Sequence, residues 1–182
     1  MSSVVPPVSV RLARPSDLRR IGPVEDTGTA LFREHLGDRL PAALTEPAPS
    51  GAWRQSVPGA LLVAVAERAL VGFAHLVWLV DDHGLPAAHL HQLSVRLPDG
   101  GRQGTGSALL AAAEDEARWA DHDRLTLTTY RDLPWNGPFY ARRGYDEVAD
   151  VPRYLQVLRD QEAASGLDAA GARVVMAKSL RR

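Results

Sequence analysis

The chain has 182 residues, of which 45% are hydrophobic, and its 21 Lys and Arg balance 22 Asp and Glu to a formal net charge of −1. This balance gives no electrostatic attraction to nucleic acid or an anionic membrane, and the lack of cysteine excludes disulfides, thiolate metal ligands and a cysteine nucleophile. No apolar run approaches the ~18 residues that cross a bilayer and the N-terminus does not resemble a signal peptide, so we expect a cytoplasmic protein without nucleic-acid or membrane partners.

The first half of the chain reads as strand, helix and then three strands. An alternating apolar stretch comes first, and "RPSDL" is a helix-start signal followed by apolar residues at helical spacing. A proline-rich stretch is typical of a loop, and two apolar runs separated by "ERA" indicate a β-hairpin. The expected elements are a strand at 8–13, one or two helices to about Leu36, a loop at 41–58 with a short helix at 42–44, and strands at 59–67, 69–80 and 87–97.

The second half adds a strand–helix–strand crossover and a closing strand. A meander followed by such a crossover predicts an α/β (α+β) fold with a mixed sheet, antiparallel at first and locally parallel in the middle. The length predicts one domain over 1–182, with an ordered core of about 8–180 and an extra helical segment at 152–167. The expected elements are a helix at 104–120, a strand at 124–130, a short helix at 135–144, a strand at 145–149, a helix at 153–166 and a strand at 171–180.

The glycine-rich stretch "GGRQGTGS" at 100–107 lies between a predicted strand and a predicted helix. It has the glycine spacing of a P-loop, but Ser107 and Ala108 stand where that motif needs lysine and a hydroxyl residue. A dinucleotide fingerprint fails because Leu109 occupies the place of its third glycine. Free amides at a helix N-terminus can still hold an anion, so a pyrophosphate seat and a turn without ligand are both consistent with the stretch taken alone.

A second block, "WNGPFYARRGY", follows "VRLPDGGRQGTGSALL" after about thirty residues and changes this balance. Together the two blocks resemble the GNAT family of N-acetyltransferases, whose first motif ends a strand and opens a helix. The family's second motif has the spacing of Asn136, Tyr140, Gly144 and Tyr145. The predicted order of strands and helices agrees with the family from about residue 8 to 180.

The resemblance implies the GNAT fold, with a mostly antiparallel central sheet, a splayed parallel strand pair and flanking helices. It also implies acetyl-CoA as acyl donor and no metal. The first block departs from the family pattern at Gly101 and Arg102, so we expect a rearranged loop in which Arg102 or Gln103 supplies the missing polar contact. The residues expected to bind the cofactor are Leu93, Ser94, Val95, Arg102, Gln103, Gly104, Thr105, Gly106, Ser107, Asn136, Tyr140 and Arg143.

Two residues are expected to carry the chemistry that the resemblance implies. Tyr140 would protonate the departing CoA thiolate, although an aromatic residue here can also simply pack the short helix. His91 stands where relatives often carry Glu and, with an ordinary pKa of ~6.5, suits the removal of a proton from the amine. His89 shares its face at a spacing of two. The His pair can instead be structural, or bind a metal with the loop residues Asp81, Asp82 or His83.

The resemblance therefore implies an enzyme that transfers the acetyl group of acetyl-CoA to a primary amine of a small molecule or a protein by direct attack in a ternary complex. A non-catalytic acyl-CoA sensor of the same fold and a metal-dependent hydrolase are the alternatives. The helix at 153–166 is a candidate lid over the acceptor, and the resemblance implies a monomer or a homodimer. Candidates for the walls of the acceptor pocket are Phe32, Trp53, Trp78, Tyr130 and Trp135.

Overall fold

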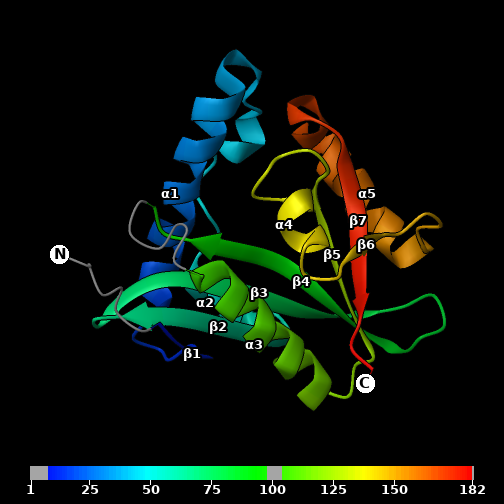
Figure 1. Ribbon diagram of the computed structural model, residues 1–182, viewed down its shortest axis with the longest axis horizontal. Coiled ribbons are helices and arrows are strands. Elements are labelled where there is room, and N and C mark those ends of the chain that lie inside the picture. The colour runs from blue at the N-terminus through cyan, green and yellow to red at the C-terminus, as the bar shows by residue number, and fades with distance from the viewer. Residues whose placement is uncertain (1–7, 98–103, 182) are drawn as a thin grey trace.

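A computed structural model describes residues 8–97 and 104–181 and shows one sheet flanked by helices (Figure 1). The strands are β1 Ser9–Leu12, β2 Gly59–Ala66, β3 Ala69–Val80, β4 Pro86–Val95, β5 Arg124–Tyr130, β6 Asp146–Glu147 and β7 Arg173–Ser179. The α-helices are α1 Leu18–Leu36, α2 Gly51–Ser56, α3 Thr105–Trp119, α4 Gly137–Ala141 and α5 Arg153–Ala164, with 3₁₀ turns η1 Gly37–Arg39, η2 Ala42–Leu44 and η3 Leu167–Ala170. None of the helices in these two ranges has the length and apolar character that crossing a bilayer requires.

The seven strands are ordered β1-β2-β3-β4-β5-β7-β6. Neighbouring strands are antiparallel except for β4 and β5, which the crossover through α3 makes parallel. The mixed sheet with a parallel pair in its middle confirms the predicted fold class.

Apolar side chains project from both faces of the sheet and pack against different helices on each face. On one face, the core includes Leu62, Leu76 and Leu90 of the strands and Leu109 and Ala113 of α3. On the other face, a smaller cluster joins Ile21 and Val24 of α1 to side chains of β2 and β3 that include Phe73. The alternation of strand side chains therefore divides the molecule into an α3 face and an α1 face.

The parallel pair holds together over a short length only. Its register runs from Ala88–Leu125 through His89–Thr126 to Leu90–Leu127, and each strand then follows its other neighbour. Beyond that point β4 stays paired with β3 as far as Val95, and β5 stays paired with β7 as far as Tyr130. The two strands consequently run apart, as Figure 1 shows.

A β-bulge in β4 marks the point of separation. The register with β3 passes from Leu76–Leu90 to His75–Gln92, which leaves His91 as the extra residue. A bulge of this kind bends its strand and raises the local twist. It therefore turns β4 away from β5 immediately after their last paired residues.

The structure differs from the sequence-based expectation in two segments. The loop expected over 41–58 contains a helix, α2, whose N-cap Ser50 accepts a hydrogen bond from the Trp53 amide at 3.1 Å. The prolines around it obscured this capping signal. The strand expected at 145–149 is only Asp146–Glu147, because it lies at the sheet edge beyond β7 and pairs on one side.

Leu109→Ala is expected to lower the free energy of unfolding by about 2–5 kcal/mol. Leu109 is fully buried, and its Cδ1 would lie 2.9 Å from a Cβ built on Gly72, so α3 fits tightly on β3 there. Urea denaturation measures the loss. The exposed Val157→Ala serves as control and should change stability by less than about 0.5 kcal/mol; similar losses in both variants would contradict this account of the core.

Candidate active site

The edge of β4 beyond the bulge provides a free strand edge inside the sheet. Leu93, Ser94 and Val95 pair with β3 on one side, while the recorded pairing with β5 has already ended at Leu90. Their backbone groups on the β5 side are therefore available to an extended ligand, which can pair with them as an added strand does. This is where the sequence placed the arm of the cofactor.

The N-terminus of α3 lies next to this edge and offers backbone donors. Gly104 precedes the helix with φ 80°, a left-handed conformation that suits glycine, and no side chain caps the helix. The amides of Thr105, Gly106 and Ser107 have no carbonyl partner within the helix, so they form an anion seat at the positive end of the helix dipole. A Cβ at Gly106 would approach Val95 Cγ2 to 3.7 Å, which links the seat to β4. The other two loop residues predicted to contact the cofactor, Arg102 and Gln103, lie outside the described residues.

Arg143 brings a cation to the same helix end. Its guanidinium stacks on Phe139 at 3.7 Å from the ring centroid, donates to the Phe139 carbonyl at 2.7 Å and donates to the Ser107 hydroxyl. A cation beside the positive end of a helix is electrostatically unfavourable unless an anion joins them. The structure thus brings Arg143 to Ser107, as the predicted binding set requires.

Asn136 and Tyr140 belong to the segment that follows β5. Asn136 lies at the start of α4, and Tyr140 lies within that helix. Asn136 is the N-cap of α4, and its Oδ1 is buried with no hydrogen-bond partner among the described residues. Tyr140 packs into the α3-face core, in edge contact with Phe139 at 5.1 Å and Tyr145 at 5.7 Å between ring centroids. Burial raises the pKa of Tyr140, an effect that the charge of Arg143 opposes, so its hydroxyl keeps its proton at neutral pH.

His91 lies on the α1 face, where side chains from α2 and β3 surround it. The Trp53 ring meets it edge-on at 6.1 Å between centroids, and the His75 ring lies 5.4 Å away. Crowding by protein atoms, and then the charge of Arg54, lower the pKa of His91 to about 4, while Glu162 acts in the opposite direction. Solvent still reaches His91, and water offsets part of this crowding. At neutral pH His91 is uncharged and can accept a proton.

His89 is buried and connects the two parallel strands, β4 and β5. Its Nδ1 lies 2.9 Å from the hydroxyl of Thr126, the residue opposite it in β5, and burial lowers its pKa to about 3. A neutral His89 fits the structural interpretation of this residue. Within residues 8–97 and 104–181, no three His, Asp or Glu side chains gather where they could hold a metal ion.

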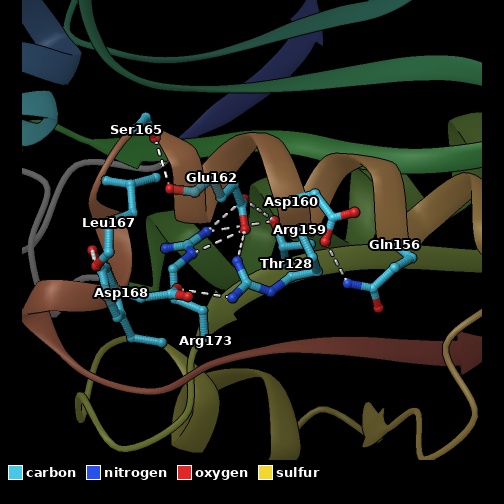
Figure 2. Close-up of polar contacts among 10 residues, drawn as sticks. Thr128, Gln156, Arg159, Asp160, Glu162, Ser165, Leu167, Asp168 and Arg173 are labelled. Atoms are coloured by element: carbon cyan, nitrogen blue, oxygen red, sulfur yellow. Dashed lines mark hydrogen bonds and ion pairs between the residues drawn. The ribbon is translucent and has the colours of Figure 1, made fainter.

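The extra helix α5 is fixed to β5 and β7 by one carboxylate. Figure 2 shows Glu162 reaching from α5 to Arg173 of β7, Arg159 of its own helix and the hydroxyl of Thr128 in β5. Its oxygens lie 2.7 and 3.1 Å from Arg173, whose guanidinium also covers the Tyr130 ring at 4.5 Å. Although burial opposes ionisation, hydrogen bonds and charge from Arg173, with Thr128 and Arg159, hold the pKa of Glu162 below its usual range.

Two surface hollows lie away from His91, Asn136 and Tyr140. The first, of about 560 Å³, is lined by β6, β7 and α5, and its Arg131 and Arg159 are paired with Glu147 and Asp168. The second, of about 380 Å³, lies under the β3–β4 loop. There Asp82 accepts hydrogen bonds from the first amides of α5, at 2.8 and 2.9 Å. Neither hollow contains His91, Asn136 or Tyr140.

The five aromatic residues predicted for the acceptor pocket fall into three places. Phe32, Tyr130 and Trp135 pack together near the C-terminal end of α1, with ring centroids 5.9 and 5.7 Å apart. Trp78 instead stacks on His122 at 4.8 Å and contacts the α3-face core. Only Trp53 contacts His91, so the single-pocket expectation was too broad. The sequence did not reveal that the His75 ring lies beside His91, or that Arg54 contacts His75 and Glu25 contacts Arg54.

The geometry defines a class: a mixed sheet with a splayed parallel pair that leads to an anion seat at a helix N-terminus. Comparison with known proteins agrees with this description of the fold. A model described as an acetyltransferase (GNAT) domain matches residues 58–147, which include β2 to β6. The chain belongs to the GNAT acetyltransferase family.

Solved structures share the fold at low sequence identity. The PaiA N-acetyltransferase of Thermoplasma acidophilum, in complex with coenzyme A, matches with a TM-score of 0.66 and 15% identity over 95% of this chain and 99% of that one. A GNAT-family acetyltransferase of Staphylococcus aureus Mu50 gives 0.65 and 14% over 96% and 100%. N-acetylglutamate synthase of Neisseria gonorrhoeae, complexed with coenzyme A and N-acetyl-glutamate, gives 0.63 and 21% over 96% of this chain, which spans only 35% of that protein.

Glu162→Gln is expected to lower the free energy of unfolding at pH 7 by about 2–3 kcal/mol, because two arginines lose the carboxylate that neutralises them. The pKa of Glu162 is lower in the folded chain than its ordinary 4.5, so its stabilisation is complete above about pH 4.5 and is lost as the pH falls through the folded pKa. Urea denaturation at pH 7 and at pH 3.5 measures both.

The control is Glu147→Gln, which removes the carboxylate of the exposed Arg131–Glu147 pair and should cost no more than about 1 kcal/mol. A Glu162→Gln loss that equals the control, or one that stays constant down to the acid range, would show that Glu162 does not hold α5 in place by charge.

Proposed function

We propose that this GNAT acetyltransferase is an N-acetyltransferase that moves the acetyl group of acetyl-CoA to a primary amine by direct attack in a ternary complex. The observation that carries the proposal is the separation of β4 and β5 directly after the His91 bulge. The strands separate between the N-terminus of α3, on one face of the sheet, and His91, on the other. The solved GNAT structures with coenzyme A support the choice of donor.

The residues present fit a pantetheine pyrophosphate ligand. The free amides at Thr105 to Ser107, with Arg143 beside them, would hold the pyrophosphate. The free edge at Leu93 to Val95 would pair with the extended amide arm. The unpartnered Asn136 Oδ1 would accept from an amide of that arm, which satisfies a buried polar group that otherwise costs about 1–3 kcal/mol.

The protein's own residues then divide the proton transfers between the two faces of the sheet. Bound acetyl-CoA would supply an electrophilic thioester carbonyl. His91, uncharged at neutral pH, accepts the proton that the attacking amine loses. The backbone amides of β4 beyond the bulge orient and polarise the acyl group. Tyr140, whose raised pKa keeps its hydroxyl protonated, donates a proton to the leaving thiolate.

The acceptor meets the α1 face, between α2 and α5. The carboxylates described near His91 are engaged: Glu25 with Arg54, and Glu162 with Arg159 and Arg173. The site therefore lacks a strong attraction for a polycation, and we propose as acceptor a primary amine, on a small molecule or a protein, that reaches His91 past Trp53.

Incubation of the protein with acetyl-CoA and a panel of amines should release free CoA with saturation kinetics. Tyr140→Phe is expected to retain acetyl-CoA binding in calorimetry and to lower kcat by about 10²-fold, the lower end for general acid catalysis, because a thiolate is already a fair leaving group. Binding without CoA release on any amine would identify an acyl-CoA sensor instead. Failure to bind acetyl-CoA or CoA would overturn the assignment of the cofactor.

His91→Ala is expected to remove the acidic limb from the pH profile of kcat/KM. In the wild type this limb should lie below the pH 6.5 of an ordinary histidine, because the pKa of His91 is lowered and His91 stops accepting protons as the pH falls through it. His83→Ala, in the exposed β3–β4 loop, is the matched control and should leave the profile unchanged. Identical acidic limbs in wild type and His91→Ala would exclude His91 as the base.

A further inference from the structure

Behind His91, three side chains from three elements form a connected chain, of which Arg54 and His75 are buried and Glu25 is partly exposed. Glu25 of α1 forms an ion pair with Arg54 of α2. Arg54 Nη1 lies 3.3 Å from Nδ1 of His75 in β3, and the His75 ring lies 5.4 Å from the His91 ring between centroids. Arg54 is 2% exposed and His75 is fully buried. The chain therefore reaches from α1 to the proposed base without contact with bulk water at its two central residues.

The hydrogen bond between Arg54 and His75 fixes the form of the histidine. A guanidinium can only donate, so Nδ1 of His75 must accept and its proton must reside on Nε2. Burial lowers the pKa of His75 to about 4, so the ring is neutral at physiological pH. Its Nε2 is buried with no partner among the described residues, which costs about 1–3 kcal/mol. Such a cost indicates that stability alone does not explain His75 and its partner.

The buried ion pair points the same way. Burial raises the pKa of Glu25 and lowers the pKa of Arg54, and each partner's charge opposes the shift in the other. A buried pair of this kind gives little net stability compared with well-packed apolar residues. The Arg54 guanidinium also lies over the ring of Phe73, with its Cζ 5.0 Å from the ring centroid. Phe73 belongs to β3, the strand that carries His75.

The charged groups around His91 come from each element packed against it. Arg54 of α2 disfavours a proton on His91, and Glu162 of α5 favours one, but Arg159 and Arg173 already neutralise Glu162. His75 of β3 and His89 of β4 are neutral because both are buried, with pKa values of about 4 and about 3. Arg54 is thus the charge that decides the protonation of His91 among these groups.

We propose that Arg54, held by Glu25 and hydrogen-bonded to His75, is a positioning residue that keeps His91 as an uncharged imidazole ready to take a proton from the acceptor amine. This rests on the proposed role of His91 as the base. The same short helix supplies Trp53, whose ring meets both His75 and His91 at 6.1 Å, so α2 delivers the charge and a wall of the site together.

The test is the titration of the His91 imidazole by ¹H–¹⁵N NMR in the ligand-free protein. In the double variant Glu25→Gln with Arg54→Met, which removes both charges and leaves no unpaired buried ion, the pKa of His91 should rise by about one pH unit. The matched control is Glu147→Gln with Arg131→Met, the same substitutions in an exposed pair, where the pKa should move by less than about 0.3 pH units.

The single variant Glu25→Gln carries the test if the double variant does not fold. It leaves the cation uncompensated, so the pKa of His91 should fall by at least about 0.3 pH units. In whichever variant folds, the acidic limb of kcat/KM should move in the same direction as the NMR titration. An unchanged His91 pKa in the folded double variant, or a rise or no change in Glu25→Gln, would overturn the role of Arg54.

Because the titration needs neither acetyl-CoA nor an amine, its result does not depend on turnover. A shifted pKa without CoA release would leave the Arg54 effect standing and contradict the proposed enzyme. CoA release with an unshifted pKa would support the proposed enzyme and contradict the Arg54 effect.

Discussion

The register between β3 and β4 takes up one extra residue at His91, and this bulge decides where β4 and β5 separate. Without it, the parallel pair would continue and its hydrogen bonds would consume the strand edge at Leu93 to Val95. With it, each strand keeps one partner and loses the other, so the sheet opens without losing its hydrogen-bonded frame. The His91 ring at this bulge lies beside the rings of His75 and Trp53.

The opening joins two faces that differ in chemistry. The α3 face carries backbone amides, Arg143 and the unpartnered Asn136 oxygen, which suit an anionic ligand with an extended amide arm. The α1 face carries aromatic rings and neutral histidines, with its charges held in pairs. The proposed base His91 and the proposed acid Tyr140 lie on opposite faces of the sheet, on either side of the splayed strands.

Buried charge has two different roles in this chain. At Glu162 it ties α5 to β5 and β7, since one carboxylate satisfies two arginines and a hydroxyl (Figure 2). The segment that the sequence suggested as a lid is thus fastened to the sheet on its inner side. At Arg54 the ion pair gives little to stability and instead places a cation close to two histidines. The Glu162 cluster is a structural tie, and the Glu25–Arg54 pair is the one that we propose sets the protonation of His91.

The sequence by itself determined the order of strands and helices along the chain, the crossover helix and the motif spacing of Asn136 and Tyr140, because apolar periodicity and local motif spacing are written in consecutive residues. It missed α2, whose capping serine lies among prolines, and it placed Trp78 with residues that lie on the other face. The tertiary structure alone decided that Glu25, Arg54 and His75 meet behind His91. They come from three elements far apart in the chain and meet through packing and strand pairing, and pairing also decides the bulge at His91. A bulge depends on pairing between strands, and the local pattern of one strand does not contain it.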